Sequence, residues 1–392
     1  MNVSRIIRYS ILIAILFSLS NCKQSKTDVL YDRKYIDQIK AARTDAGFYL
    51  SANLVPGGNF AVAKNGKIIY SEGMGLASED LNVPATRNTK FRIGQVSEVF
   101  TALIYQKMVE EGTLQPDSVV QYYYPGFPEK KFPLPIHHLV SQTSGIREPN
   151  ENEKDWRGLN ISSEQGLDSF KADSLLFTPG MYMLPSMFNY NLLGVVMEKA
   201  TNKKFHSILE EYVTDTLNLK FTEPDNPLAT IKGRSDFFDH NFIAQVVKAT
   251  TRDMRYKAPS EGLLSNAEDL VKLGNAILYS DYFTTGFKEK LFEPVLISGS
   301  TPSRMANGWI LMTDNSGRKI YGRSGTVTGG GAALLIYPDE NLVVACAVNV
   351  GSLSDDYPVF AMAQHFFSEN EKQSKENTPA ENKEEEAQPD KK

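Results

Sequence analysis

The chain has 392 residues, of which 41% are hydrophobic and 23% are charged, and its formal net charge is −5. This length and composition are typical of a globular protein with one large or two modest hydrophobic cores. The acidic balance gives no reason to expect a nucleic-acid partner.

The N-terminus has the pattern of a bacterial export signal. Two arginines precede residues 11–19, an apolar run too short to span a bilayer comfortably as a helix. The sequence Leu-Ser-Asn-Cys, which ends at Cys22, resembles a loose lipobox, although Asn21 departs from its strict form. We therefore predict a lipoprotein signal peptide over residues 1–21, an acylated Cys22 and a tether over 22–30. A plain signal peptide with an incidental cysteine is the alternative.

The far end of the chain is different in composition. Residues 368–392 contain no aromatic and no large aliphatic residue, so they cannot bury enough apolar surface to offset the cost of ordering. We predict a disordered polar tail there and one folded domain over residues 31–367. The second cysteine, Cys346, lies in the apolar run 342–348, where we expect a buried strand and no internal disulfide.

The first two thirds of the domain are predicted to be mostly helical, with one hairpin. Alternating apolar residues over 59–75 flank Asn65-Gly66, a strong signal for a type I′ turn. The apolar spacing indicates helices over 31–50, 97–111, 133–145 and 186–201, and a turn followed by a helix over 258–278.

The last third is predicted to be mostly strands. These are expected over 308–312, 319–321, 332–337 and 342–348, followed by a helix over 357–367. Strands at both ends of the domain around a helical middle indicate an α+β fold. In it, an antiparallel sheet is formed from both chain ends and a helical lobe is inserted between them.

Residues 91–101 read Phe-Arg-Ile-Gly-Gln-Val-Ser-Glu-Val-Phe-Thr. They resemble the Ser-x-x-Lys segment of the serine β-lactamase and penicillin-binding-protein family, whose nucleophilic serine follows Ile-Gly. Here the serine position is Gln95 and the lysine position is Glu98. An amide is not a usable nucleophile, and a carboxylate does not replace the amine that activates a serine hydroxyl.

Further segments extend this resemblance over about residues 59–350 and imply a β-lactamase/transpeptidase-like fold. Residues 135–145 resemble the family's RHLLSHTSG segment, and Pro-Gly at 179–180 followed by Leu-Leu-Gly at 192–194 resembles another family frame. Residues 258–270 resemble PAGGLxSTAEDL, and residues 307–309 resemble GLGW. Together these segments occur in the family's order and at its spacing.

The other two catalytic motifs of the family are also altered. Its Tyr-x-Asn motif falls on Pro185 and Met187, which provide neither a phenol nor an amide. The third motif, Lys-Thr-Gly or His-x-Gly on an edge strand, is Arg323-Ser324-Gly325 here. Arginine keeps a positive charge and can hold a carboxylate, but it is too basic to carry protons.

These three departures predict that the family's catalysis is absent. We further expect Glu98 and Arg323 to form an ion pair across the old site. The resemblance implies an oxyanion hole of backbone amides near Gln95 and Thr326, which side-chain changes do not remove. The ligand-binding candidates are therefore Arg323, Ser324, Gly325, Thr326, Gln95 and Ser186.

Three functions are compatible with the sequence. The first is a membrane-anchored envelope lipoprotein that binds a cell-wall peptide or another carboxylate-bearing ligand without catalysis. The second is an esterase or peptidase with a relocated nucleophile, either Ser97 or Ser186. The third is a scaffold for a protein partner, for which the tyrosines at 122–124 are a candidate surface. No His, Cys or acidic cluster has zinc or calcium spacing, so no metal and no cofactor are expected.

Overall fold

The computed structural model describes residues 28–154, 162–351 and 356–368. The predicted signal peptide, Cys22 and residues 369–392 lie outside the described residues. Within the described ranges, no helix has both the length and the apolar character needed to cross a bilayer.

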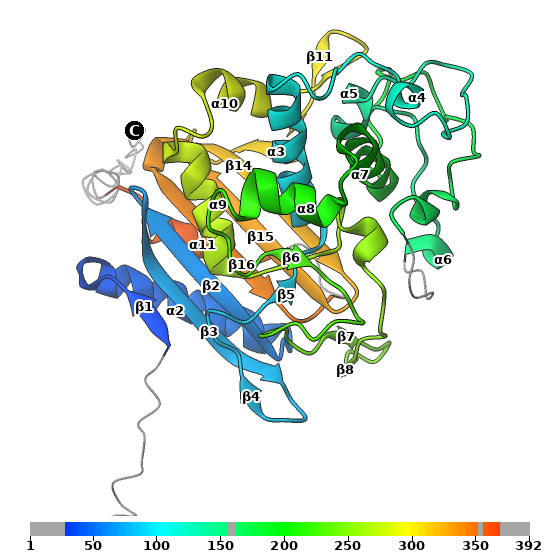
Figure 1. The fold of residues 1–392 in the computed structure, drawn as a ribbon. Coiled ribbons are helices and arrows are strands. Elements are labelled where there is room, and N and C mark those ends of the chain that lie inside the picture. Colours follow the sequence, from blue (N-terminus) through cyan, green and yellow to red (C-terminus); the bar gives the residue numbers. More distant parts are fainter. Residues whose placement is uncertain (1–27, 155–161, 352–355, 369–392) are drawn as a thin grey trace, which may run out of the picture.

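The centre of the molecule is an antiparallel sheet with the strand order β1-β3-β2-β16-β15-β14-β13-β12, and β4 pairs with β3 (Figure 1). The pairing of β2 with β16 sets Phe60 opposite Cys346 and so joins the two ends of the domain. This confirms the predicted α+β fold. The strands, in sheet order, are Val29–Tyr31, Lys67–Ser78, Gly57–Lys64, Leu342–Val348, Gly330–Tyr337, Lys319–Val327, Trp309–Thr313 and Met305–Ala306, with β4 at Val83–Pro84.

The two faces of the sheet are covered by different helices because side chains alternate along each strand. In β2, Phe60 and Val62 pack into one core with α2 (Ile36–Ala52) and α11 (Val359–Gln364). Ala61 and Ala63 face the other core, with α9 (Ala267–Tyr279) and the helical lobe. The remaining helices are α3 (Ser97–Glu110), α4 (Val120–Tyr123), α5 (His137–Val140), α6 (Glu151–Lys154), α7 (Met187–Thr201), α8 (Phe205–Leu209) and α10 (Thr285–Leu291).

Short strands complete the fold outside the central sheet. One small sheet has the order β5-β9-β6, and two hairpins are formed by β7 with β8 and by β10 with β11. Their bounds are Phe91–Arg92 (β5), Leu263–Ser265 (β9), Glu223–Pro224 (β6), Phe238–His240 (β7), Val246–Lys248 (β8), Leu296–Ile297 (β10) and Thr301–Pro302 (β11).

The predicted hairpin and the helix that follows it are confirmed. Asn65 and Gly66 both have positive φ, 52° and 76°, as a type I′ turn requires. Helix α3 spans Ser97–Glu110, and Gly112 beyond it also has positive φ. The predicted helix over 186–201 is α7, with Ser186 at its N-cap.

Several predicted boundaries are wrong. The first helix begins at Ile36, because Val29–Tyr31 form the edge strand β1, so residues 29 and 30 belong to the sheet and not to the tether. Of residues 133–145 only His137–Val140 are helical, since two prolines precede them and Gln142 has positive φ.

The end of the domain also differs from expectation. Residues 263–265 form β9 where only a turn was expected, and the C-terminal helix is shorter than predicted, Val359–Gln364. Ser368, assigned to the tail, is bound to the domain: its backbone N–H and Oγ–H both donate to Glu340, at 3.1 and 2.8 Å. Strand β16 and the buried Cys346 match the prediction, and burial raises the pKa of this thiol to about 12.

Candidate functional site

A cavity of about 390 Å³ lies between the sheet edge at β14 and the helical lobe. The five residues that the resemblance sets at the family's catalytic motifs all line it: Gln95, Glu98, Pro185, Met187 and Arg323. The structure therefore brings together residues that are more than 200 positions apart in sequence, as the resemblance implied.

Close approach of two backbones builds one wall of this cavity. The ladder between β13 and β14 ends at Gly322, which leaves the next residues of β14 open on that side. The short helical turn Gly94–Val96 before α3 packs there. A β-carbon added at Gly325 would lie 2.3 Å from the backbone N of Gln95, so this approach requires glycine.

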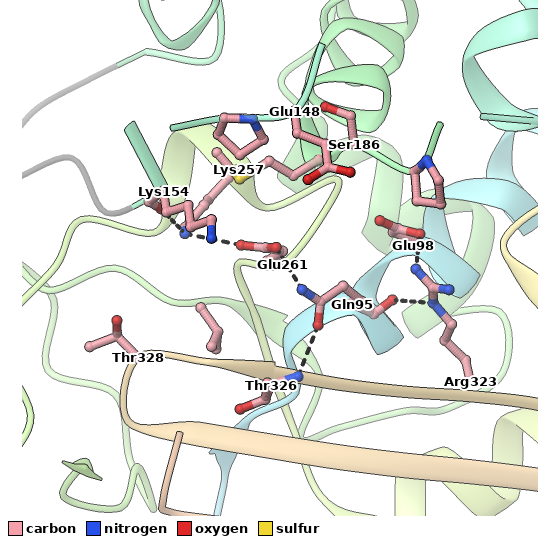
Figure 2. Close-up of a pocket in the computed structure, with 14 residues that line it drawn as sticks. Gln95, Glu98, Glu148, Lys154, Ser186, Lys257, Glu261, Arg323, Thr326 and Thr328 are labelled. Carbon is pink, nitrogen blue, oxygen red and sulfur yellow. Dashed lines mark hydrogen bonds and ion pairs between the residues drawn. The ribbon is translucent and has the colours of Figure 1, made fainter. Parts of the chain in front are cut away.

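The side chain of Gln95 bridges this wall and the opposite one. Its Oε1 accepts a hydrogen bond from the backbone N–H of Thr326 at 2.9 Å, and its Nε2 donates to Glu261 Oε1 at 2.8 Å (Figure 2). The Thr326 amide was expected to be available to a ligand. It is instead occupied by a side chain of the protein itself.

The predicted ion pair between Glu98 and Arg323 is confirmed. Arg323 Nη2 donates to Glu98 Oε2, and Arg323 Nε lies 3.4 Å from the backbone oxygen of Gln95. Burial, together with the charge of Glu261, raises the pKa of Glu98 to about 7, although the Arg323 charge opposes the shift. No hydrogen bond within the described residues uses Arg323 Nη1, and Arg323 lines the cavity.

A second buried ion pair, which the sequence analysis missed, continues this network. Lys257 Nζ lies 3.1 Å from Glu261 Oε2 and donates to the backbone oxygen of Lys154 at 2.7 Å. Figure 2 shows the connection from Lys257 through Glu261 and Gln95 to Arg323. A signal was present, because Glu261 stands where the resembling segment PAGGLxSTAEDL has its first glycine.

Neither candidate for a relocated nucleophile has the surroundings of one. Ser97 is fully buried, and its Oγ accepts a hydrogen bond from the backbone N–H of Leu263 at 3.2 Å. Ser186 Oγ donates to the Arg147 backbone oxygen at 2.8 Å and accepts from Phe188 N–H, which is an N-cap arrangement.

Two of the six ligand-binding candidates are not part of the cavity lining. Ser324, the residue after Arg323 on β14, does not line the cavity. Gly325 is covered by Gln95. The other four candidates, Gln95, Ser186, Arg323 and Thr326, all line the cavity.

Other expected features lie away from the cavity. Among the described residues no group of three or more His, Cys, Asp or Glu side chains is arranged to hold a metal ion. Of the three consecutive tyrosines, Tyr122 is exposed, whereas Tyr124 is buried and donates to Glu164 at 2.8 Å.

An antiparallel sheet built from both chain ends, an inserted helical lobe and a cleft between them define the β-lactamase/transpeptidase class of fold. A family model described as "Beta-lactamase" matches residues 36–363. The chain therefore belongs to the β-lactamase family.

Relatives and solved structures of this family share modest sequence identity with the chain. The human serine beta-lactamase-like protein LACTB, mitochondrial, is 27% identical over 65% of this chain and 58% of its own length. Protein flp of Staphylococcus aureus strain MW2 is 24% identical over 76% of this chain and 60% of its own. The chain thus spans less than two thirds of either relative. The octameric penicillin-binding protein homologue from Pyrococcus abyssi superposes with a TM-score of 0.71, at 22% identity, over 83% of this chain and 77% of that one.

Proposed function

We propose that this protein is a pseudoenzyme of the β-lactamase family: a lipoprotein of the bacterial cell envelope that binds a carboxylate-bearing ligand, such as the end of a cell-wall peptide. The observation that carries the proposal is the position of Gln95. Its amide stands where the family has its nucleophile and occupies the Thr326 N–H, which the resemblance assigns to the oxyanion hole.

The chemistry of the surrounding side chains supports the absence of catalysis. The lysine position holds Glu98, which is buried and paired with Arg323. The tyrosine position holds Pro185, which has no proton to transfer. The hydroxyls of Ser97 and Ser186 are engaged with the backbone, which disfavours a relocated nucleophile at either position.

The charges of the cavity support a ligand that carries a carboxylate and amide groups. Arg323 presents Nη1, a donor without a partner in the described residues, and the guanidinium geometry suits a carboxylate. Lys154 and Lys257 line the same cavity, as do Glu148 and Glu261. A lining that carries both positive and negative side chains suits the amide and carboxylate groups at the end of a peptide. It suits an apolar ligand less well.

The anchoring part of the proposal rests on the N-terminal sequence. Cys22 follows an export signal and ends a lipobox-like tetrapeptide, so a diacylglyceryl thioether on its sulfur would hold the domain at a membrane. The domain would then lie at the cell envelope, on the periplasmic or the surface side.

Two measurements test the proposal. Intact mass spectrometry after incubation with a reactive penicillin, and separately with a fluorophosphonate, is expected to show no adduct; a discrete adduct would identify a nucleophile and refute the pseudoenzyme. Calorimetric titration with a cell-wall stem peptide is expected to show binding that weakens when the peptide ends in an amide. Equal affinity for both peptides, or no binding of either, contradicts the carboxylate site. Arg323→Gln should weaken the binding of the peptide with a free carboxylate. The exposed Arg33→Gln is the control and should leave it unchanged.

A further inference from the structure

An apolar surface lies on the turn that joins β7 to β8. Phe242 at this turn is 98% exposed and its neighbour Ile243 is 57% exposed. No other large hydrophobic side chain of the described ranges is as exposed as Phe242. Such exposure costs solubility, and a group of apolar side chains presented together marks an interaction site.

The turn holds these side chains outward by its own hydrogen bonds. The side-chain oxygen of Asn241 accepts from the backbone N–H groups of Ile243 and Gln245, at 3.1 and 2.9 Å. Asn241 Nδ2 in turn donates to Gln245 Oε1 at 3.1 Å, and Ala244 adopts a positive φ of 58°. The turn is thus closed across its base, and Phe242 is presented by a fixed backbone.

A second apolar tip lies beside this hairpin. The turn between β3 and β4 exposes 76% of Leu81, and Val83 after it is also exposed. Lys248 of β8 forms an ion pair with Asp80, so the two hairpins are joined. This pair offsets the charges of Lys248 and Asp80, and Glu79 on the β3–β4 turn is exposed beside Leu81. Figure 1 shows β4 and the β7–β8 hairpin at the same, lower end of the molecule.

The N-terminus enters the domain alongside β3, the strand that leads to the Leu81 turn. Val29 of β1 pairs with Glu72 of β3 in antiparallel fashion, so the start of β1 points toward the β3–β4 turn. Asp28, the first described residue, lies 2.9 Å from Arg87, three residues beyond β4. Cys22 is six residues earlier in the sequence. Six residues span at most about 20 Å when fully extended.

From these observations we propose that the two hairpin tips, Leu81 with Val83 and Phe242 with Ile243, form a membrane-docking surface that inserts into the leaflet carrying the lipid on Cys22. This rests on the proposed lipoprotein. The short tether joins the strand that leads to the Leu81 turn, so the lipid on Cys22 keeps the tips near the bilayer. Apolar side chains at an interface partition into the region between headgroups and acyl chains. The lipid anchor and the tips together fix the orientation of the domain, which the anchor alone leaves free.

The test uses the full mature chain with Phe242→Cys, labelled with an environment-sensitive fluorophore. Cys346 is buried and its thiol has a raised pKa, so it is not expected to react. The chain is reconstituted in vesicles of phosphatidylethanolamine and phosphatidylglycerol that contain brominated lipid. We expect a blue shift and quenching of the label. The control is Tyr122→Cys, a 71% exposed aromatic on α4 at the opposite end of the molecule, whose label stays in water.

The mass of the mature chain, measured first, separates the two proposals. A Cys22 without lipid refutes the anchored lipoprotein and removes the tether argument with it. A lipidated chain whose label at position 242 is neither shifted nor quenched refutes the docking surface alone. A blue shift that occurs without vesicles and grows with protein concentration also refutes it, because a second copy of the chain then covers the tips.

Discussion

The side-chain oxygen of Gln95 accepts a hydrogen bond from the backbone N–H of Thr326 at 2.9 Å. A ligand carbonyl or carboxylate would use the same donor, so the protein occupies this position with its own amide. The other end of that amide is held by Glu261 at 2.8 Å. The protein's own side chains therefore engage the Thr326 donor and hold the glutamine in place.

Replacing Gln95 by alanine should expose the Thr326 amide to a ligand. We expect a stem peptide with a free carboxylate to bind about tenfold more tightly to Gln95→Ala, because one charge-assisted hydrogen bond becomes available. Calorimetric titration measures this. The exposed Gln115→Ala is the control and should leave the affinity unchanged. Weaker binding to Gln95→Ala would show instead that the glutamine contacts the ligand.

Stability should depend on pH through Glu98. Its pKa rises from 4.5 to about 7 on folding, mainly by burial, so the folded state binds the proton more tightly than the unfolded state. The resulting stabilisation is complete below pH 4.5 and is lost as the pH rises through 7. Relative to Glu98→Gln, the wild type should lose about 3 kcal/mol across this range.

Urea unfolding at several pH values measures this difference between the wild type and Glu98→Gln. Parallel stability profiles for the two proteins would contradict it. The neutral Glu98→Gln variant keeps the shape of the side chain, so a change in packing does not explain a difference in slope.

The family and the core strands of the domain could be predicted from the sequence because they depend on local patterns. Strand β16 has a continuous apolar run, and the β2–β3 turn has the residue pair that its two positive φ values require. The predicted helix over 133–145 was wrong for an equally local reason: the apolar spacing favours a helix, but two prolines interrupt its start and Gln142 adopts a positive φ near its end. The Glu98–Arg323 pair was predicted because the resemblance supplied the proximity.

The second ion pair was not predicted, since nothing in the local pattern of Lys257 distinguishes a buried lysine from a surface one. Lys257 is buried, and its Nζ donates to the backbone oxygen of Lys154, 103 residues earlier. Likewise, the occupied Thr326 amide follows from the approach of two backbones, which only the three-dimensional structure shows. Contacts between distant segments complete the site, and apart from Glu261 at a glycine position of the resembling segment, the local sequence pattern gives no indication of them.

The Glu98–Arg323 pair should show energetic coupling. Removing one partner of a buried pair leaves the other uncompensated, so Glu98→Ala and Arg323→Ala should each destabilise the fold, and the double variant should cost less than their sum. We expect a coupling free energy of about 1–3 kcal/mol at pH 8. The half-exposed pair Lys203–Glu211 is the control and should couple by less than about 1 kcal/mol. Additive effects at the buried pair would mean that the two charges do not stabilise each other.

Replacing Ser186 distinguishes a structural role of its hydroxyl from a reactive one. Its Oγ caps α7 and donates to the Arg147 backbone oxygen, so Ser186→Ala should destabilise the fold by about 1 kcal/mol. Thr284→Ala, which removes the N-cap of α10, should have a similar cost. Fluorophosphonate should label neither variant nor the wild type. A wild type that is labelled, together with a Ser186→Ala variant that is not, would make this hydroxyl the relocated nucleophile, because a helix cap alone does not change covalent labelling.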